Sequence, residues 1–152
     1  MMSNLRELYQ EMILDHGRNP RHHQTMPLAN RLAHGFNQLC GDRLTVYLKI
    51  EENKITAISF QGSGCAISMA SASLMSEILL GKTLSEAETL FETFHQLLTR
   101  ETATPEQLQD LEKLTVFSGV KAYPARVKCA TLAWHTLLAA LKQKNELVST
   151  EH

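Results

Sequence analysis

The stretch LTVYLKIEENKITAISFQGSGCA, residues 44–66, decides the fold. Over residues 44–50, apolar side chains alternate with polar or aromatic ones, which is the period of a strand with one buried face. A polar turn follows at 51–54, and the strand pattern resumes over 55–60. Together these features predict an antiparallel hairpin. The sequence GSGC at 62–65 then turns the chain into a helix, because its two glycines permit a tight turn.

Helices are expected on both sides of the hairpin. Before it, a run of apolar side chains at helical spacing ends at Asn19-Pro20, because a proline pushes the preceding residue out of the helical region. A strand over 31–38 would give the hairpin the third partner that it needs for stability. The expected helices cover residues 4–16, 66–80, a segment from Thr83 or Ser85 (each opening a capping box) to Leu98, residues 104–114 and residues 124–141, with a link over 116–123. This order predicts an α+β domain in which about five helices cover one face of a three-stranded antiparallel sheet.

Length and composition narrow the function classes. A chain of 152 residues forms a single domain, and we expect frayed ends over 1–4 and 145–152. The formal net charge of -1 and the single tryptophan give no reason to expect a nucleic acid partner. No apolar run is long enough to span a bilayer, and the first residues lack the features of a secretory signal. We therefore expect a cytoplasmic protein without a membrane partner, whose thiols stay reduced.

Each of the three cysteines has neighbours that favour the thiolate, the form that binds metals and attacks sulfur. Cys65 stands at the start of the 66–80 helix, where the helix dipole favours negative charge. Cys129 lies in the first or second turn of the last helix, with Arg126 on the same helical side. Cys40 comes just before Asp42, and side chains at this spacing point the same way in an extended segment.

Three sulfurs and one carboxylate would suit a tetrahedral zinc site or a small iron–sulfur cluster. The long gaps between the cysteines make this pattern weak by spacing, and three unrelated buried cysteines are the simpler alternative. The histidines are expected outside the site: in a loop (His22 and His23), at the surface (His34 and His95), at a frayed end (His152) and on the far side of the last helix (His135). The core is expected to include Trp134, Leu132, Leu137, Leu138, Leu141, Met69 and Met75.

Three segments taken together resemble the U-type iron–sulfur cluster assembly proteins, the IscU/NifU N-terminal superfamily. These segments are CGDR at 40–43, GSGCAISMASAS at 62–73 and PARVKCATLAW at 124–134. The N-terminal Tyr9, Ile13 to His16, and Asn19-Pro20-Arg21 fit the same family, so that the resemblance covers about residues 5 to 142. Within the family the chain resembles the SufU branch more than the IscU branch. Residues 99–121 look like the SufU insertion, and Lys128 stands where IscU proteins have a histidine directly before the third cysteine.

The resemblance implies a SufE/NifU/IscU-like fold and a metal site made of Cys40, Asp42, Cys65 and Cys129. In SufU-like members this site holds zinc and receives persulfide sulfur from a pyridoxal-phosphate cysteine desulfurase (SufS-like), with the residue that matches Cys40 as the acceptor. IscU-like members instead assemble a [2Fe–2S] cluster from iron and sulfur on these cysteines and hand it to apo-proteins. Arg126 would be an auxiliary residue that holds Asp42 or offsets the negative charge.

Three functions remain open from the sequence: a zinc-dependent sulfurtransferase, a non-enzymatic scaffold for cluster assembly, and a zinc-stabilised interaction module without sulfur chemistry. Lys128 favours sulfur transfer over the scaffold. A hydrolytic zinc enzyme is disfavoured, because four protein ligands leave no open position for water. The chain departs from the family at Gln38-Leu39, where a proline is common, and we expect this change to loosen the loop that carries Cys40 while leaving the ligands intact.

Overall fold

An antiparallel hairpin lies at the centre of the fold in this computed structural model, which describes residues 2–38, 40–99, 104–142 and 147–149. Strands β2 (Asp42–Glu51) and β3 (Lys54–Ser63) pair through a tight turn, in which Glu52 and Asn53 have positive φ. Strand β1 (Arg31–Asn37) pairs antiparallel with the other edge of β2. The expected three-stranded antiparallel sheet is therefore confirmed.

A short fourth strand extends this sheet where the sequence predicted no regular element. Strand β4 (Leu147–Ser149) pairs parallel to β1, which gives the strand order β3-β2-β1-β4. It falls within the segment 145–152 that we expected to be frayed. At the other end of the chain, the first helix already begins at Met2.

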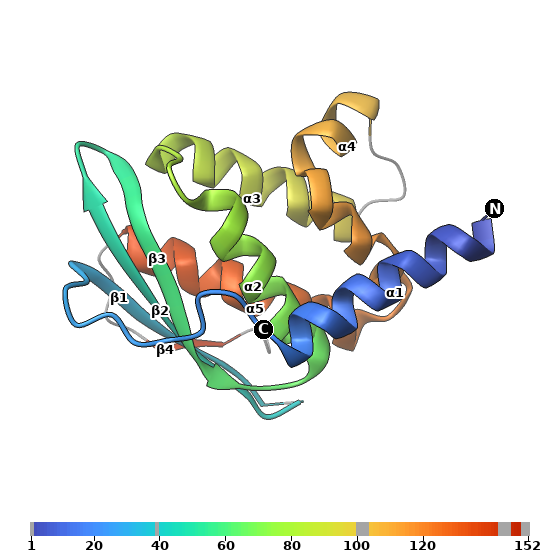
Figure 1. The fold of residues 1–152 in the computed structure, drawn as a ribbon, viewed down its shortest axis with the longest axis horizontal. Helices are drawn as coiled ribbons and strands as arrows, with labels where there is room; N and C mark the ends of the chain where they lie inside the picture. The colour runs from blue at the N-terminus through green and yellow to red at the C-terminus, as the bar shows by residue number, and fades with distance from the viewer. Residues whose placement is uncertain (1, 39, 100–103, 143–146, 150–152) are drawn as a thin grey trace.

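Five α-helices gather on one side of the sheet, as Figure 1 shows, and the expected α+β architecture is confirmed. They are α1 (Met2–Arg18), α2 (Ala66–Leu79), α3 (Leu84–Thr99), α4 (Pro105–Leu111) and α5 (Pro124–Leu141). Thr83, rather than Ser85, forms the capping box of α3: its hydroxyl accepts from the Glu86 N–H at 3.1 Å, and its own N–H donates to the Glu86 carboxylate at 3.0 Å. Within the described part of the chain, no helix has the length and apolar character needed to cross a membrane.

The expected link over 116–123 is instead most of a 3₁₀-helix, η1 (Glu112–Ala122), and α4 ends earlier than predicted because Glu112 takes a positive φ of 51°. Leu114, Phe117 and Val120 recur every third residue and are all buried. A 3₁₀-helix has three residues per turn, so this spacing directs all three side chains to one face. The apolar pattern thus explains why the segment is wound rather than extended.

The core lies between the inner face of the sheet and helices α2, α3 and α5. Trp134 is fully buried, and its ring lies 5.2 Å from that of Phe94 between centroids. Most of the predicted core residues are confirmed as buried: Leu132, Leu137, Leu141, Met69 and Met75. Leu138 is half-buried and packs against them. The small side chains of α2 let α1 and the sheet approach it closely.

His16 is a buried polar residue between α1 and α2. Its Nδ1 lies 2.7 Å from the Ser73 hydroxyl, which also accepts from the Arg21 N–H at 2.8 Å. The Ser73 hydroxyl therefore connects the His16 imidazole to the backbone of Arg21. Burial lowers the pKa of His16 below its ordinary value of 6.5, and Arg21 nearby adds to this effect.

We expect the stability of the folded domain to fall as the pH drops below about 6.5. Because the pKa of His16 is lowered in the folded state, the unfolded chain binds the proton more readily than the folded one. The stability that is present above pH 6.5 is therefore lost as the pH falls through the lowered pKa of the folded state. Burial lowers the pKa of His135 too, with the same sign. Urea unfolding of reduced, metal-free protein at several pH values measures this slope. His16→Asn should flatten it and the exposed His34→Asn should not; an unchanged slope in His16→Asn would contradict the assignment.

Candidate metal centre

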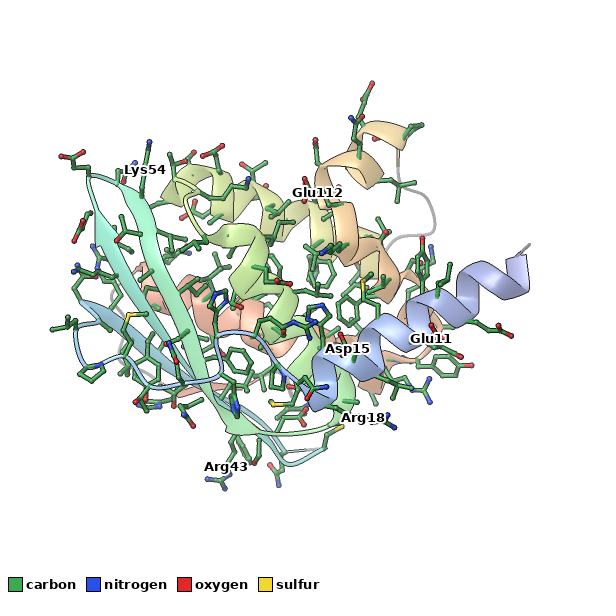
Figure 2. All side chains as sticks on the ribbon, viewed as in Figure 1. Glu11, Asp15, Arg18, Arg43, Lys54 and Glu112 are labelled. Atoms are coloured by element: carbon green, nitrogen blue, oxygen red, sulfur yellow. The ribbon has the colours of Figure 1, made fainter. Side chains whose placement is uncertain are left out.

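Two turns and helix α5 bring the predicted ligands to one end of the sheet. Cys40 lies in the turn between β1 and β2, and Asp42 is the first residue of β2. Cys65 immediately precedes α2, and Cys129 lies in the second turn of α5. Figure 2 labels Arg43, the residue after Asp42, and shows its side chain projecting outward at the bottom of the view.

The four predicted ligands lie close together. Among the described residues, the ligand atoms of Cys40, Asp42 and Cys129 lie within 4.8 Å of one another. The sulfurs of Cys40 and Cys129 are 3.0 Å apart, and the Cys65 sulfur is 4.0 Å from Asp42 Oδ2. Their exposure differs: Cys129 and Asp42 are buried, Cys65 is half-buried and Cys40 is exposed.

The Asp42 carboxylate is fully buried and is held through both of its oxygens. Oδ1 accepts the backbone N–H of Cys65 at 2.8 Å, and Oδ2 lies 3.4 Å from the amide nitrogen of Asn37. A buried carboxylate needs such donors to offset the loss of water. Gly64 makes the first bond possible, because a Cβ at this position would collide with Asp42 Oδ1.

The start of α2 stabilises negative charge on Cys65. Its sulfur caps the helix by accepting the Ser68 N–H at 3.5 Å. The hydrogen bond from Cys129 is the main effect that lowers the pKa of Cys65 to about 7, against the opposing effect of burial. The same hydrogen bond, burial and the contact with Cys40 raise the pKa of Cys129. Without a metal, the pair therefore loses its first proton more readily from Cys65 than from Cys129.

Arg126 is exposed in the first turn of α5, and its guanidinium lies 4.6 Å from the centre of the Tyr123 ring. The ion pair that we expected with Asp42 is not among the contacts of the described residues. The described histidines lie outside the ligand cluster: His22 contacts the Ser76 hydroxyl, His23 contacts the Gly62 carbonyl, and His135 packs edge-on against Phe91. His152 lies outside the described residues. His95 is half-buried beside Phe91, rather than fully at the surface.

Asn37 is a site residue that the sequence analysis missed. It is fully buried, and its amide nitrogen lies 3.6 Å from the Cys129 sulfur as well as 3.4 Å from Asp42. It is the register partner of Asp42 across the β1–β2 ladder. The signal that could have found it is this pairing: in a tight hairpin, the residue that precedes the Cys40 turn stands opposite the first residue after it.

The donor set fits a metal with an affinity for sulfur. Three cysteine sulfurs and one carboxylate converge, and zinc and iron–sulfur clusters are the groups that proteins hold with such ligands. The carboxylate is already oriented by its two donors, as the ligands of metal sites usually are. Cys40, Asp42 and Cys129 therefore form a group that could hold a metal ion, and Cys65 lies beside it; the set of four ligands stays a prediction.

The fold and this thiolate–carboxylate cluster define a protein of the iron–sulfur cluster assembly class, and comparisons with known proteins agree. The chain belongs to the family of NifU-like N-terminal domains, whose model matches residues 8–130. It is 39% identical over 136 residues to the iron–sulfur cluster assembly scaffold protein IscU of Thermotoga maritima, covering 90% of this chain and 94% of the relative. It is 36% identical over 136 residues to the zinc-dependent sulfurtransferase SufU of Bacillus subtilis, covering 89% and 90%.

A solved structure shares the fold as well. The crystal structure of FiSufU from thermophilic Fervidobacterium islandicum AW-1, described as a scaffold protein for the SUF system, matches with a TM-score of 0.81 and 35% identity. The match covers 86% of this chain and 94% of that one. Relatives named IscU and SufU thus match this chain at similar identities, so identity by itself does not assign it to one branch.

We expect Gly64→Ala to disrupt the centre, because the added methyl group displaces the Asp42 carboxylate and breaks its bond with the Cys65 N–H. Zinc affinity, measured by competition with a chromophoric chelator, should fall about 10-fold or more. The free energy of unfolding should fall by about 1–3 kcal/mol. Gly119→Ala is the matched control, because a Cβ there meets no atom within 4 Å. Equal zinc affinity in both variants would show that the Gly64 contact does not support the site.

Proposed function

We propose that this chain accepts persulfide sulfur at Cys40 from a pyridoxal-phosphate cysteine desulfurase, as a zinc-dependent step in cytoplasmic iron–sulfur cluster assembly. The observation that carries the proposal is the difference between Cys40 and its partners. Cys40 is exposed on a turn while its sulfur lies 3.0 Å from that of buried Cys129, so it can belong to the ligand set and still be reached from outside.

In this mechanism the Cys40 thiolate attacks the terminal sulfur of the desulfurase persulfide. A new S–S bond forms at Cys40 Sγ, the S–S bond on the desulfurase breaks, and the desulfurase cysteine leaves as a thiolate, so that charge and electrons balance. Gly41, with φ of 70° and no neighbour within 4 Å of a Cβ position, gives the turn room to move.

The remaining residues keep the site in place during transfer. Asp42, Cys65 and Cys129 would hold zinc together with Cys40, and bound zinc keeps the thiols deprotonated at neutral pH. Asp42 stays fixed through the Cys65 N–H and Asn37. We assign the exposed Arg126 an auxiliary role, in which its positive charge would offset the negative charge of the incoming persulfide.

We expect Cys40→Ser to abolish sulfur uptake, because a hydroxyl is not a competent nucleophile toward sulfur at neutral pH. The assay mixes the protein with a cysteine desulfurase and cysteine, follows alanine release, and locates persulfide on this chain by mass spectrometry. Alanine release should drop to the level of the desulfurase alone, while the exposed variant His34→Asn should behave as the original protein does. Persulfide on Cys65 or Cys129 with unchanged release would assign the acceptor role elsewhere.

A cluster scaffold is the second candidate, because relatives at 36–39% identity carry that name and the same ligand set suits a [2Fe–2S] cluster with iron and sulfide as substrates. Metal analysis of protein purified without added iron, followed by anaerobic reconstitution, separates the two. Bound zinc without a visible chromophore supports sulfur transfer. A stable chromophore with stoichiometric iron supports the scaffold, and the finished cluster would then pass to apo-proteins. Zinc that stabilises the domain while no cysteine ever carries persulfide would indicate an interaction module.

A further inference from the structure

Asn37 is a neutral amide that is buried among the predicted ligands. It ends β1, stands opposite Asp42 in the ladder and is fully buried. Its single nitrogen carries two hydrogens, and two ligand atoms lie near it: Asp42 Oδ2 at 3.4 Å and the Cys129 sulfur at 3.6 Å. One side chain thus connects a ligand on β2 with a ligand on α5.

The orientation of this amide follows from its neighbours. A carboxylate oxygen and a metal-binding sulfur are both acceptors, so only the nitrogen side can face them; a flipped amide would set its oxygen against the Asp42 carboxylate. In this orientation Asn37 Oδ1 is buried and has no hydrogen-bond partner among the described residues. Leaving a buried acceptor unpaired costs free energy. An apolar side chain of similar volume would avoid this cost, which indicates that the two donors matter.

We propose that Asn37 is a positioning residue of the metal centre, which holds Asp42 and Cys129 as the fixed ligands and donates hydrogen bonds to their negative charge. This inference rests on the proposed function, because it concerns the same ligands. Cys65 is fixed separately, by the N-terminal N–H of Ser68. Cys40 is exposed, and no hydrogen bond from the Asn37 amide reaches it among the contacts of the described residues. The amide therefore helps to divide the set into anchored ligands and one ligand that can leave.

Cobalt substitution tests this role without any desulfurase. Asn37→Leu keeps most of the volume and removes both donors. Its cobalt affinity should fall about 10–100-fold, the range seen when a partner of a metal ligand is lost. The sulfur-to-cobalt charge-transfer band should also move to longer wavelength, because a sulfur without a donor holds its electrons less tightly. Asn30→Leu is the matched control: that amide bonds the backbone of Ile50, away from the centre, and its loss should leave band and affinity unchanged.

Two results would overturn the proposal. The first is an Asn37→Leu variant whose cobalt affinity and charge-transfer band equal those of the original protein. The second is a lower cobalt affinity with an unmoved charge-transfer band, which a merely structural role would give. If Asn37→Leu does not fold, as judged by circular dichroism, Asn37→Ala removes the same donors without adding bulk, and the same criteria apply to it. Protein that binds cobalt but accepts no persulfide would contradict the proposed sulfur transfer. The cobalt affinity and the charge-transfer band would still test the positioning role of Asn37.

Discussion

The hydrogen bond from the Cys65 N–H to the Asp42 carboxylate holds the site together, and the geometry around it depends on this bond. It joins the first residue of β2 to the start of α2, although the two residues lie 23 positions apart. Through Asn37 the same carboxylate contacts the end of β1, and Asn37 in turn contacts Cys129 on α5. Four elements therefore meet at one buried carboxylate, and a shift of any of them would move a ligand.

Burying this much negative charge requires compensation from the fold. Backbone N–H groups at the start of α2 supply part of it, since Cys65 and Asp42 each accept one. The Asn37 amide supplies another part from the strand side. Asn37 Oδ1 has no hydrogen-bond partner among the described residues, and departures of this kind tend to gather at functional positions. The site thus has a local cost that a uniformly apolar core would avoid.

Local signals made most of the fold predictable, and non-local contacts account for what was missed. The alternation over 44–50, the capping box at Thr83 and the glycine turn before Cys65 each depend on neighbours in sequence, and the structure has them as expected. The 3₁₀-helix was missed because buried residues at every third position also occur in loops, and β4 because its pairing with β1 joins distant segments. The contacts of Asn37 and Arg126 depend on cross-strand register and on stacking with Tyr123, which no motif encodes.

The turn that carries Cys40 also limits how a partner protein can be shaped. Asp42 is anchored, and Cys40 is connected to it through Gly41 alone, so the Cα of Cys40 stays within about 7 Å of the Cα of Asp42, at roughly 3.5 Å per residue. Such a short tether cannot reach into a deep cleft on another protein. The donor must instead carry its own sulfur outward on a protruding loop, or dock closely enough that the two surfaces enclose the exchange. The donor protein, rather than Cys40, would then cover most of the distance between the two reacting sulfurs.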